Sequence, residues 1–276
     1  MTFDLHVHSH YSDGTWSPFA LVRHAVRLHL KQLAITDHDT TAGIAEAVAA
    51  AGKEIEIIPA VEINTVHECA GEREDIHILG YFVDQGNSGL QAVLAKQQQA
   101  RQNHVLETIA SLRKTGVDID ESSVQRFAGL GSIGRAHITE AIVEAGGAAD
   151  LTAAYEKYMK RSSPFYVPRK SVSPYEAIEA INRAGGISSI AHPGKEAHID
   201  NLILQLREHG LRAIEAFHRV HSLNRVRHYI RLAHRNNMLI TGGSDCHGPY
   251  GEFAPTVGSI SLPSEIMTKL RSSCAL

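Results

Sequence analysis

The side chains best suited to chemistry are imidazoles and carboxylates that fall in short apolar segments. His6 and His8 form a His-x-His pair in a predicted strand at residues 3–7, and the period of two along a strand places both rings on one face. Imidazole and carboxylate ligands without thiolates suit Mn²⁺, Fe²⁺ or Zn²⁺. Because the donors are more numerous than one ion takes, the sequence predicts two or three bound divalent metals. The other donors accompany the remaining predicted strands: Asp13, His38, Glu62, His77, His192, Asp245 and His247.

Alternating strands and helices are predicted to position these donors. Helices are predicted after Ser17-Pro18, at residues 41–51, and after the capping box Ser173-Pro174-Tyr175-Glu176. Repeated βα units predict an α/β fold with a parallel sheet or barrel, whose strand ends meet at one face. Donors far apart in the sequence would then share one site. Apolar, β-branched runs predict the strands at residues 3–7, 32–36, 55–63, 76–83, 187–191, 211–217, 238–241 and 257–260.

Residues 88–163 interrupt this alternation with helices alone. A long helix is predicted at residues 88–115, and shorter helices at 135–144 and 151–160. The long helix has a polar centre, and a helix that is polar all round is expected to leave the core. We therefore predict a barrel formed by residues 1–87 and 164–276, with a helical insertion at residues 88–163 that acts as a lid or substrate subdomain.

Each histidine taken alone is more simply explained as a hydrogen-bonded structural residue. The metal interpretation is favoured because separate strand ends carry such donors in apolar surroundings, where an unpaired polar group costs about 1–3 kcal/mol. Histidines without this setting are interpreted as ordinary helix or surface residues: His24, His29, His104, His198, His209, His228 and His234.

Composition narrows the class of protein. The chain has 276 residues with 43% hydrophobic and 21% charged residues, which excludes a disordered or fibrous chain. A formal charge of -3 gives no general attraction to nucleic acid or membranes, so any polyanion must be bound locally. The three cysteines lack C-x-x-C spacing, which favours a reducing, cytoplasmic setting. We expect neither export nor a membrane span, since no apolar run reaches about 18 residues. We also expect no obligate protein partner.

Four segments resemble the motifs of the polymerase-and-histidinol-phosphatase (PHP) family: Asp4-Leu5-His6-Val7-His8-Ser9, Ile35-Thr36-Asp37-His38-Asp39, Ala191-His192-Pro193-Gly194 and Gly243-Ser244-Asp245-Cys246-His247. The resemblance implies a distorted (β/α)7 barrel that holds three divalent metals, usually manganese, iron or zinc, and hydrolyses phosphate esters. It also implies a ligand set. One metal would be held by His6, His8, Glu62 and Asp245, a second by His77 and His192 with Glu62 bridging, and a third by Asp13, His38 and His247.

Within the family, residues 75–84 and 133–138 are most similar to the 3',5'-nucleotide bisphosphate phosphatases, a branch that also includes enzymes trimming RNA from its 5' end. Relatives commonly have Arg-Pro-His where this chain has Arg135-Ala136-His137, a departure that keeps the arginine. The resemblance implies a phosphomonoesterase that removes the 3'-phosphate of a nucleoside 3',5'-bisphosphate, such as adenosine 3',5'-bisphosphate, to give AMP. Short RNA 5' ends are a second expected substrate.

A cluster of metals suits phosphoryl transfer because it activates water as hydroxide and neutralises charge on the phosphoryl oxygens, so no protein nucleophile is needed. A second phosphate on the substrate needs cations of its own, and guanidinium groups bind phosphate through paired hydrogen bonds. Arg135, Arg169 and Lys170 are the candidates, with solvated surface charge as the alternative explanation. His218 is the candidate acid for the leaving oxygen, and His221 is a candidate substrate contact.

Other functions are open at this level. Hydrolysis of histidinol phosphate needs the metals but no cations for a second phosphate. A metal-dependent amidohydrolase would attack a carbonyl carbon, but such barrels commonly use a carbamylated lysine, and no lysine sits at a predicted strand end. A non-catalytic module that uses metals for folding or docking is a further alternative. The G-x-G-x-x-G pattern at residues 129–134 is not interpreted as a dinucleotide site, because no strand precedes it.

Overall fold

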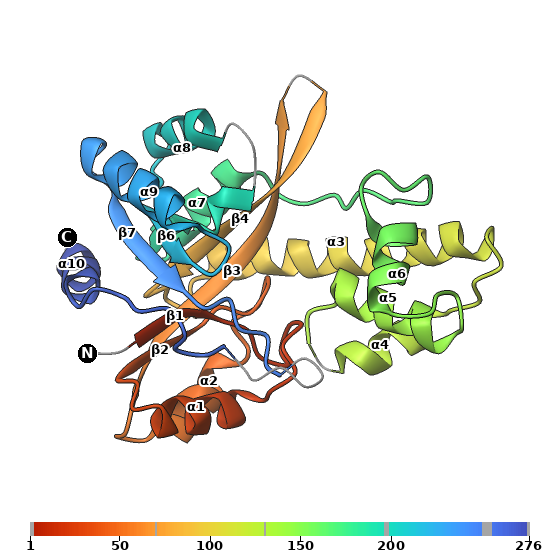
Figure 1. The fold of residues 1–276 in the computed structure, drawn as a ribbon, viewed down its shortest axis with the longest axis horizontal. Helices are drawn as coiled ribbons and strands as arrows, with labels where there is room; N and C mark the ends of the chain where they lie inside the picture. The colour runs from red at the N-terminus through yellow and green to blue at the C-terminus, as the bar shows by residue number, and fades with distance from the viewer. Residues whose placement is uncertain (1–2, 70, 130, 196–198, 250–255, 275–276) are drawn as a thin grey trace.

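A single seven-stranded sheet forms the centre of the computed structural model, which describes residues 3–69, 71–129, 131–195, 199–249 and 256–274 (Figure 1). The strands lie side by side in chain order. Hydrogen bonds of 2.8 Å from His8 N to Cys246 O and from Asp245 N to His6 O join the segment after the last strand to the first, so the barrel is nearly closed. The predicted seven-stranded α/β barrel is confirmed. Its strands are β1 (Phe3–Val7), β2 (Gln32–Ile35), β3 (Glu56–Cys69), β4 (Glu72–Tyr81), β5 (Ile187–Ile190), β6 (Ala213–His218) and β7 (Leu239–Gly243).

The sheet is mixed rather than purely parallel. β1, β2 and β3 pair in parallel, as do β5, β6 and β7, whereas β4 runs antiparallel to both β3 and β5. Cys69 and Glu72 are paired across a short turn, and strands joined by so short a turn can only be antiparallel. The prediction of parallel βα units was therefore wrong for β4. The strand predicted at residues 257–260 was also wrong, because no strand forms there.

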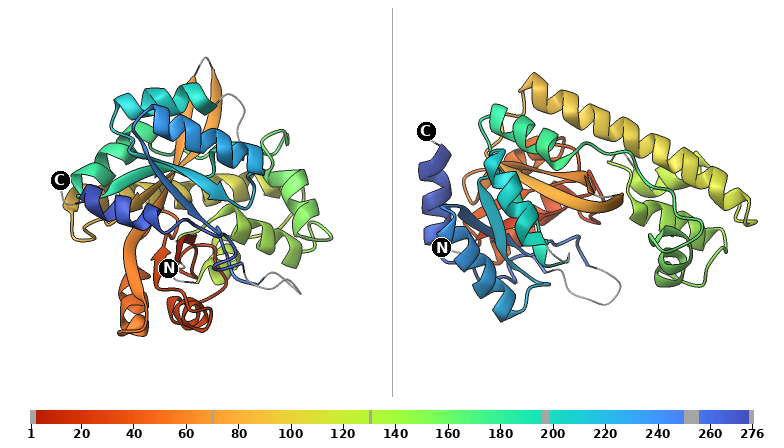
Figure 2. Two further views of the ribbon diagram at one scale, coloured as in Figure 1. Left: turned by 60° about the vertical axis from the view of Figure 1, so that its left-hand side comes forward. Right: turned by 90° about the horizontal axis from the view of Figure 1, so that it is seen from above.

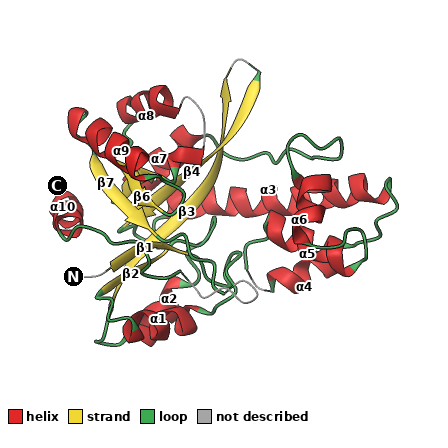
Figure 3. Ribbon diagram, in the orientation of Figure 1, coloured by secondary structure: helices red, strands yellow, loops and turns green. Residues whose placement is uncertain are grey.

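Helices cover the outside of the barrel (Figure 3). The predicted caps are confirmed at two of them: Ser17 Oγ accepts a hydrogen bond from Ala20 N at 3.1 Å, and Ser173 forms a capping box with Glu176. Aliphatic side chains such as Leu21 and Ile178 pack against the strands and are fully buried. The elements of this layer are α1 (Pro18–Arg27), α2 (Ile44–Ala51), α7 (Pro174–Arg183), the 3-10 turn η2 (Pro193–Lys195), α8 (Ile199–Glu208), α9 (Leu223–Arg235) and α10 (Glu265–Cys274).

Between β4 and α7 the described residues form helices and loops. The long helix α3 extends away from the barrel, and shorter helices pack against its far part (Figure 2). Val105, Ile109, Ile138 and Ile142 contribute to a separate apolar cluster in this region. The division of the chain into a barrel and an insertion at residues 88–163 stays a prediction. The helices are α3 (Ser88–Arg113), α4 (Glu121–Ala128), α5 (Arg135–Glu144), α6 (Leu151–Ala154) and the π-helical turn η1 (Tyr155–Met159).

One side of the polar centre of α3 is buried while Gln99, Gln102 and Asn103 are exposed, so the expectation that the polar centre leaves the core was wrong for that side. Gln97, Arg101 and His104 are almost fully covered. Arg101 Nε donates to Asp39 Oδ2 at 2.7 Å, and its Nη2 donates to Asn64 Oδ1 at 2.9 Å. These bonds tie α3 to the part of the barrel that carries the predicted donors. His104, which the sequence suggested was an ordinary helix or surface residue, is one of these buried side chains. His198, interpreted in the same way, lies outside the described residues.

Candidate metal centre

Glu62 on β3 lies at the centre of the predicted metal ligands. Its side chain is fully buried, and imidazoles approach both of its oxygens. These imidazoles come from β1 and the residue after it, from the segments after β2 and β5, and from β4, so elements distant in the sequence meet at one carboxylate. Oε2 lies 3.3 Å from His6 Nε2, 3.2 Å from His8 Nε2 and 3.0 Å from His38 Nδ1, and Oε1 lies 2.9 Å from His77 Nδ1 and 3.2 Å from His192 Nε2.

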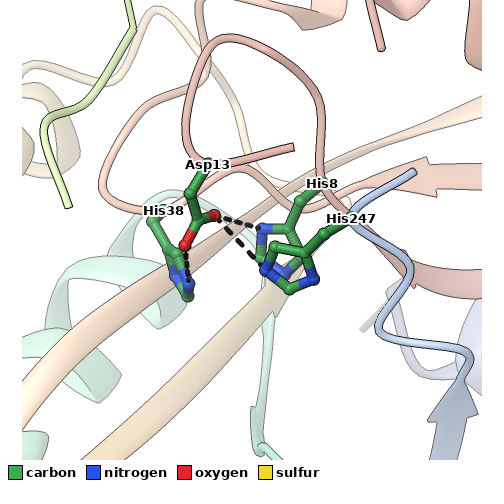
Figure 4. Close-up of side chains that lie close together, drawn as sticks. All are labelled: His8, Asp13, His38 and His247. Carbon is green, nitrogen blue, oxygen red and sulfur yellow. Dashed lines mark ion pairs between the residues drawn. The ribbon is translucent and has the colours of Figure 1, made fainter. Parts of the chain in front are cut away.

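A second group surrounds Asp13, in the loop after β1 (Figure 4). Its Oδ1 lies 3.3 Å from His247 Nε2 and 3.9 Å from His8 Nδ1, and its Oδ2 lies 3.8 Å from His38 Nε2. The carboxylate therefore faces imidazoles from three different segments. The resemblance had implied Asp13, His38 and His247 as one ligand set, and the structure places His8 beside them.

Asp245, after β7, completes the arrangement. Its Oδ1 lies 3.4 Å from His6 Nε2 and 3.3 Å from His8 Nε2, and its Oδ2 lies 3.3 Å from His218 Nε2. A Cβ on Gly243 would lie only 2.4 Å from the Cβ of His6, so glycine is required where β7 approaches β1 this closely. This close approach brings Asp245 within reach of the His-x-His pair.

The backbone is strained where several of these residues leave the strands. Asp39, His192 and Asp245 have φ values of 56°, 31° and 52°, in the left-handed region that side chains other than glycine rarely adopt. Each such residue costs about 1–3 kcal/mol and persists because the surrounding structure holds it. Strain of this kind clusters at functional sites, and here it follows β2, β5 and β7.

The donor set fits divalent cations. His6 donates its Nδ1–H to Glu215 Oε1 at 2.8 Å, and His247 donates its Nδ1–H to the carbonyl of Asp245 at 3.0 Å. Both rings then turn an Nε2 lone pair toward the other donors, the tautomer that metal-binding histidines adopt. Asp13 Oδ1 and His38 Nδ1 are buried and face other candidate ligands, at 3.3 Å from His247 Nε2 and 3.0 Å from Glu62 Oε2. Atoms that coordinate one ion at about 2.1 Å are separated by roughly 3 to 3.5 Å, close to the distances around Glu62 and Asp245.

The buried carboxylates make the site strongly attractive to cations. Burial alone lowers the pKa of His6, but the charges of Glu215, Glu62 and Asp245 hold it well above its usual value. Despite burial, hydrogen bonds to Asp245 and Glu62 raise the pKa of His8 to about 10. Burial raises the pKa of Glu62, but the nearby histidines, led by His38, hold it well below its usual range. Protons and divalent metals therefore compete for the same ring nitrogens.

Glu215 on β6 is a site residue that the sequence did not predict. Its Oε1 accepts the His6 hydrogen bond, and its Oε2 accepts a hydrogen bond of 2.6 Å from the backbone N–H of His192. It is fully buried, and these two hydrogen bonds hold His6 and His192 in position. Its only signal in the sequence is one acid between apolar residues of a strand. Asp37 has a similar supporting role, since it accepts hydrogen bonds from Ser9 N at 2.6 Å and from Ser12 Oγ at 2.8 Å.

A cavity of about 110 Å³ lies beside the candidate ligands. Its lining includes Asp13, His38 and His77 together with Arg135 and Arg169. Two of the predicted substrate cations therefore share a cavity with predicted metal ligands.

The cations at this cavity differ in how they are held. The side chain of Arg169 is mostly buried, and its Nε donates to Ser171 Oγ at 2.8 Å. Burial, together with the neighbouring charge of Arg101, lowers the pKa of Arg169 to about 10. Lys170 is exposed and does not line this cavity.

His218 and His221 are both buried but differ in their ring contacts. His218 Nδ1 accepts a hydrogen bond from Val220 N at 3.3 Å, so in the neutral ring the proton is on Nε2, on the side of Asp245. His221 donates its Nδ1–H to Ala216 O at 2.8 Å, and its Nε2 accepts from Gly194 N at 3.0 Å. The backbone therefore engages both ring nitrogens of His221, and in this structure neither is free for a substrate.

Comparison with known proteins places these features in context. The family model of the PHP domain matches residues 4–241 of this chain. The chain is 34% identical over 254 residues to the 5'-3' exoribonuclease Rnm of Escherichia coli, covering 90% of this chain and 85% of the relative. It is 32% identical over 261 residues to the 3',5'-nucleoside bisphosphate phosphatase of Chromobacterium violaceum, covering 92% and 90%.

Solved structures with the same fold include a Bifidobacterium adolescentis protein assigned to the metal-dependent phosphoesterases, with a TM-score of 0.88, 29% identity, and coverage of 98% of this chain and 95% of that one. An amidohydrolase from Chromobacterium violaceum, with bound sulfate and no metal, has a TM-score of 0.86 and 31% identity and covers 99% and 96%. No helix in the described part of this chain is both long and apolar enough to cross a membrane.

Proposed function

Because this chain belongs to the PHP family and is a metal-dependent phosphoesterase, we propose that it removes the 3'-phosphate of nucleoside 3',5'-bisphosphates. The observation that carries this proposal is the cavity shared by Asp13, His38 and His77 with Arg135 and Arg169. Adenosine 3',5'-bisphosphate, which yields AMP and phosphate, serves as the test substrate. Similarity to the bisphosphate phosphatase of Chromobacterium violaceum supports the same choice.

The two phosphates of such a substrate have different binding partners. The scissile phosphate belongs among the imidazoles and carboxylates, and the other phosphate belongs with Arg135 and Arg169. A guanidinium group binds a phosphate with paired, charge-assisted hydrogen bonds, so two arginines at one cavity favour a second phosphate. A substrate with a single phosphate would bring no second phosphate to these two arginines.

We propose that the chain binds up to three divalent metals, with Mn²⁺ as the first ion to test. When bound, these ions lower the pKa of a coordinated water and neutralise charge that develops on the phosphate. Glu215 holds His6 and the backbone of His192 in position for this binding. The proposed ligands are His6, His8, Asp13, His38, Glu62, His77, His192, Asp245 and His247.

His218 is the proposed acid for the leaving oxygen. Its Nε2 is buried and lies 3.3 Å from Asp245 Oδ2, while its Nδ1 accepts a hydrogen bond from the backbone. The ring is thus fixed with its Nε2–H beside the candidate ligands. A positioned acid of this kind typically contributes about 100- to 10,000-fold to the rate.

Trimming of short RNA from the 5' end is a second candidate function. A second cavity includes His77 and His192 in its lining, together with Tyr155, Lys160 and Arg161. An aromatic ring and two cations next to a phosphoesterase site suit the base and phosphate of a further nucleotide. Similarity to exoribonuclease Rnm supports this candidate.

Two other hydrolases are less well supported. Histidinol phosphate has no second phosphate for Arg135 and Arg169. Amide hydrolysis in metal barrels commonly uses a carbamylated lysine, and no lysine is among the described residues that line the cavity with Asp13, His38 and His77.

The test is a phosphate-release assay with Mn²⁺, Fe²⁺ or Zn²⁺ on adenosine 3',5'-bisphosphate, 3'-AMP, histidinol phosphate and short 5'-phosphorylated RNA. Arg135→Gln and Arg169→Gln each remove charge-assisted hydrogen bonds worth roughly 1.5–3 kcal/mol, so the KM for the bisphosphate should rise about 10- to 100-fold. The KM for histidinol phosphate should change little. Arg183→Gln, on an exposed pair with Glu179, is the control. Activity confined to histidinol phosphate would overturn the proposal.

A further inference from the structure

Asp75 is an acidic residue in a site that must receive a polyanion. It lines the cavity beside the candidate ligands, the cavity that contains Tyr155, and a third cavity that contains Arg73. It lies on β4 two residues before His77, so both side chains lie on the same face of the strand. A carboxylate in this place repels a phosphate, and its presence therefore needs an explanation.

Two arginines from different elements converge on Asp75. Arg135 Nη2, at the start of α5, lies 3.3 Å from Asp75 Oδ2, and Arg161 Nη2, just after η1, lies 3.6 Å from Asp75 Oδ1. Arg161 also contacts the hairpin formed by β3 and β4, because its Nη1 donates to the carbonyl of Arg73 on β4. The carboxylate therefore occupies the position between two guanidinium groups that an anion would take.

The ion pairs of Asp75 with Arg135 and Arg161 are weak enough for another anion to replace the carboxylate. The side chains are 39% exposed for Arg135, 50% for Arg161 and 32% for Asp75, and both contacts are long. The nearby pair of Arg101 and Asp39 is different, because it is buried with contacts of 2.6 and 2.7 Å. Exposed pairs contribute about 0.2–1 kcal/mol each, so an incoming phosphate can displace Asp75 but not Asp39.

We propose that Asp75 occupies the anion site of Arg135 and Arg161 in the substrate-free protein, and that the second phosphate of the substrate displaces it. The inference rests on the proposed function and adds Arg161 to the phosphate-binding residues. A phosphate dianion has three strong acceptor oxygens and replaces a carboxylate on two guanidinium groups, whereas weaker, singly charged anions do not. Asp75 is then a specificity-determining residue that works by competition.

The kinetic test is Asp75→Asn, which keeps the size of the side chain and removes its charge. Loss of two exposed pairs predicts that the KM for adenosine 3',5'-bisphosphate falls about three- to tenfold. The KM for 3'-AMP, which has no 5'-phosphate, should stay within about twofold. Glu68→Gln is the matched control, since Glu68 also pairs with an arginine, Arg73, on the same hairpin but does not line these cavities.

Opposite outcomes separate the alternatives. A higher KM for the bisphosphate in Asp75→Asn would mean that Asp75 only orders the two arginines, and it would overturn the inference. An equal fall in KM for the bisphosphate and for 3'-AMP would mean general charge repulsion, and it would overturn the inference as well.

A binding measurement tests Asp75 independently of activity. The full chain is stripped of metal with a chelator and titrated with inorganic phosphate in a calorimeter. Asp75→Asn should bind phosphate about three- to tenfold more tightly than the unaltered chain, and the gain should shrink when Arg161→Gln is added. Arg161→Gln alone should weaken binding, which keeps the test valid even if Asp75→Asn does not fold.

The binding test also distinguishes the inference from the proposed function. If the unaltered chain does not hydrolyse the bisphosphate, the proposed function fails, while the titration still decides the role of Asp75. Equal phosphate affinity in the unaltered chain, in Asp75→Asn and in Arg161→Gln would overturn the inference.

Discussion

Replacing Glu215 by glutamine should weaken metal binding without removing any proposed ligand. Glu215 accepts two hydrogen bonds, from His6 Nδ1–H and from the His192 backbone. The Gln side chain has one acceptor oxygen and one NH₂ donor, so only one of these bonds can be accepted and the negative charge is lost. A lost buried bond of this type costs roughly 1.5–3 kcal/mol, which corresponds to about a 10- to 100-fold lower metal affinity.

The assay reconstitutes the chelated chain over a series of buffered Mn²⁺ concentrations, with metal content and phosphate release followed together. The Mn²⁺ concentration that gives half-maximal activity should rise about 10- to 100-fold in Glu215→Gln, and kcat at saturating metal should recover to within a few-fold. Glu179→Gln is the control, since Glu179 is exposed on α7. The reasoning is refuted if Glu215→Gln binds Mn²⁺ as tightly as the unaltered chain, or if kcat stays low at full occupancy.

Further predictions concern stability and catalysis. Arg101→Gln leaves the buried Asp39 carboxylate without its ion pair and should lower the free energy of unfolding in urea by about 3 kcal/mol, whereas the exposed Arg183→Gln should change it by less than about 0.5 kcal/mol. Burial lowers the pKa of His104 to about 4 from its usual 6.5, so the unfolded chain takes up a proton that the folded chain does not between these values. As the pH falls from 7 to 4, the unaltered chain should therefore lose up to about 3 kcal/mol relative to His104→Gln, and parallel pH profiles would contradict this. His218→Asn should lower kcat about 100-fold with unchanged metal content, and an unchanged kcat would exclude its role as the acid.

The residues at the centre of the site were predictable because their signals are local. His6 on β1 and His8 directly after it alternate with apolar residues, and this period of two indicates that both rings share one face. Glu62 and His192 lie in or next to apolar segments, so their burial could be expected. The barrel then explains why such distant donors meet.

The supporting residues were not predictable because their roles depend on contacts between distant segments. Arg101 lies in the middle of a helix whose buried stripe is polar at its centre, and this stretch gives no hydrophobic period. Its burial follows from the contact with Asp39, which the sequence does not reveal. Glu215 is one acid between apolar residues of β6, a pattern shared by many structural residues.

The direction of β4 was missed for a different reason. The hairpin it forms with β3 extends through polar residues such as Asn64 and Glu74, which do not resemble a core strand. His77 therefore reaches the site from within an antiparallel strand rather than from a carboxyl end.

The most direct test of the central claim is metal content per chain measured together with phosphate release from adenosine 3',5'-bisphosphate. We predict that phosphate release disappears when a chelator removes the metal, returns in proportion to rebound divalent ions, and is lost with the metal in a His6→Ala, His8→Ala double variant. Full phosphate release from a chain without bound metal would contradict the account.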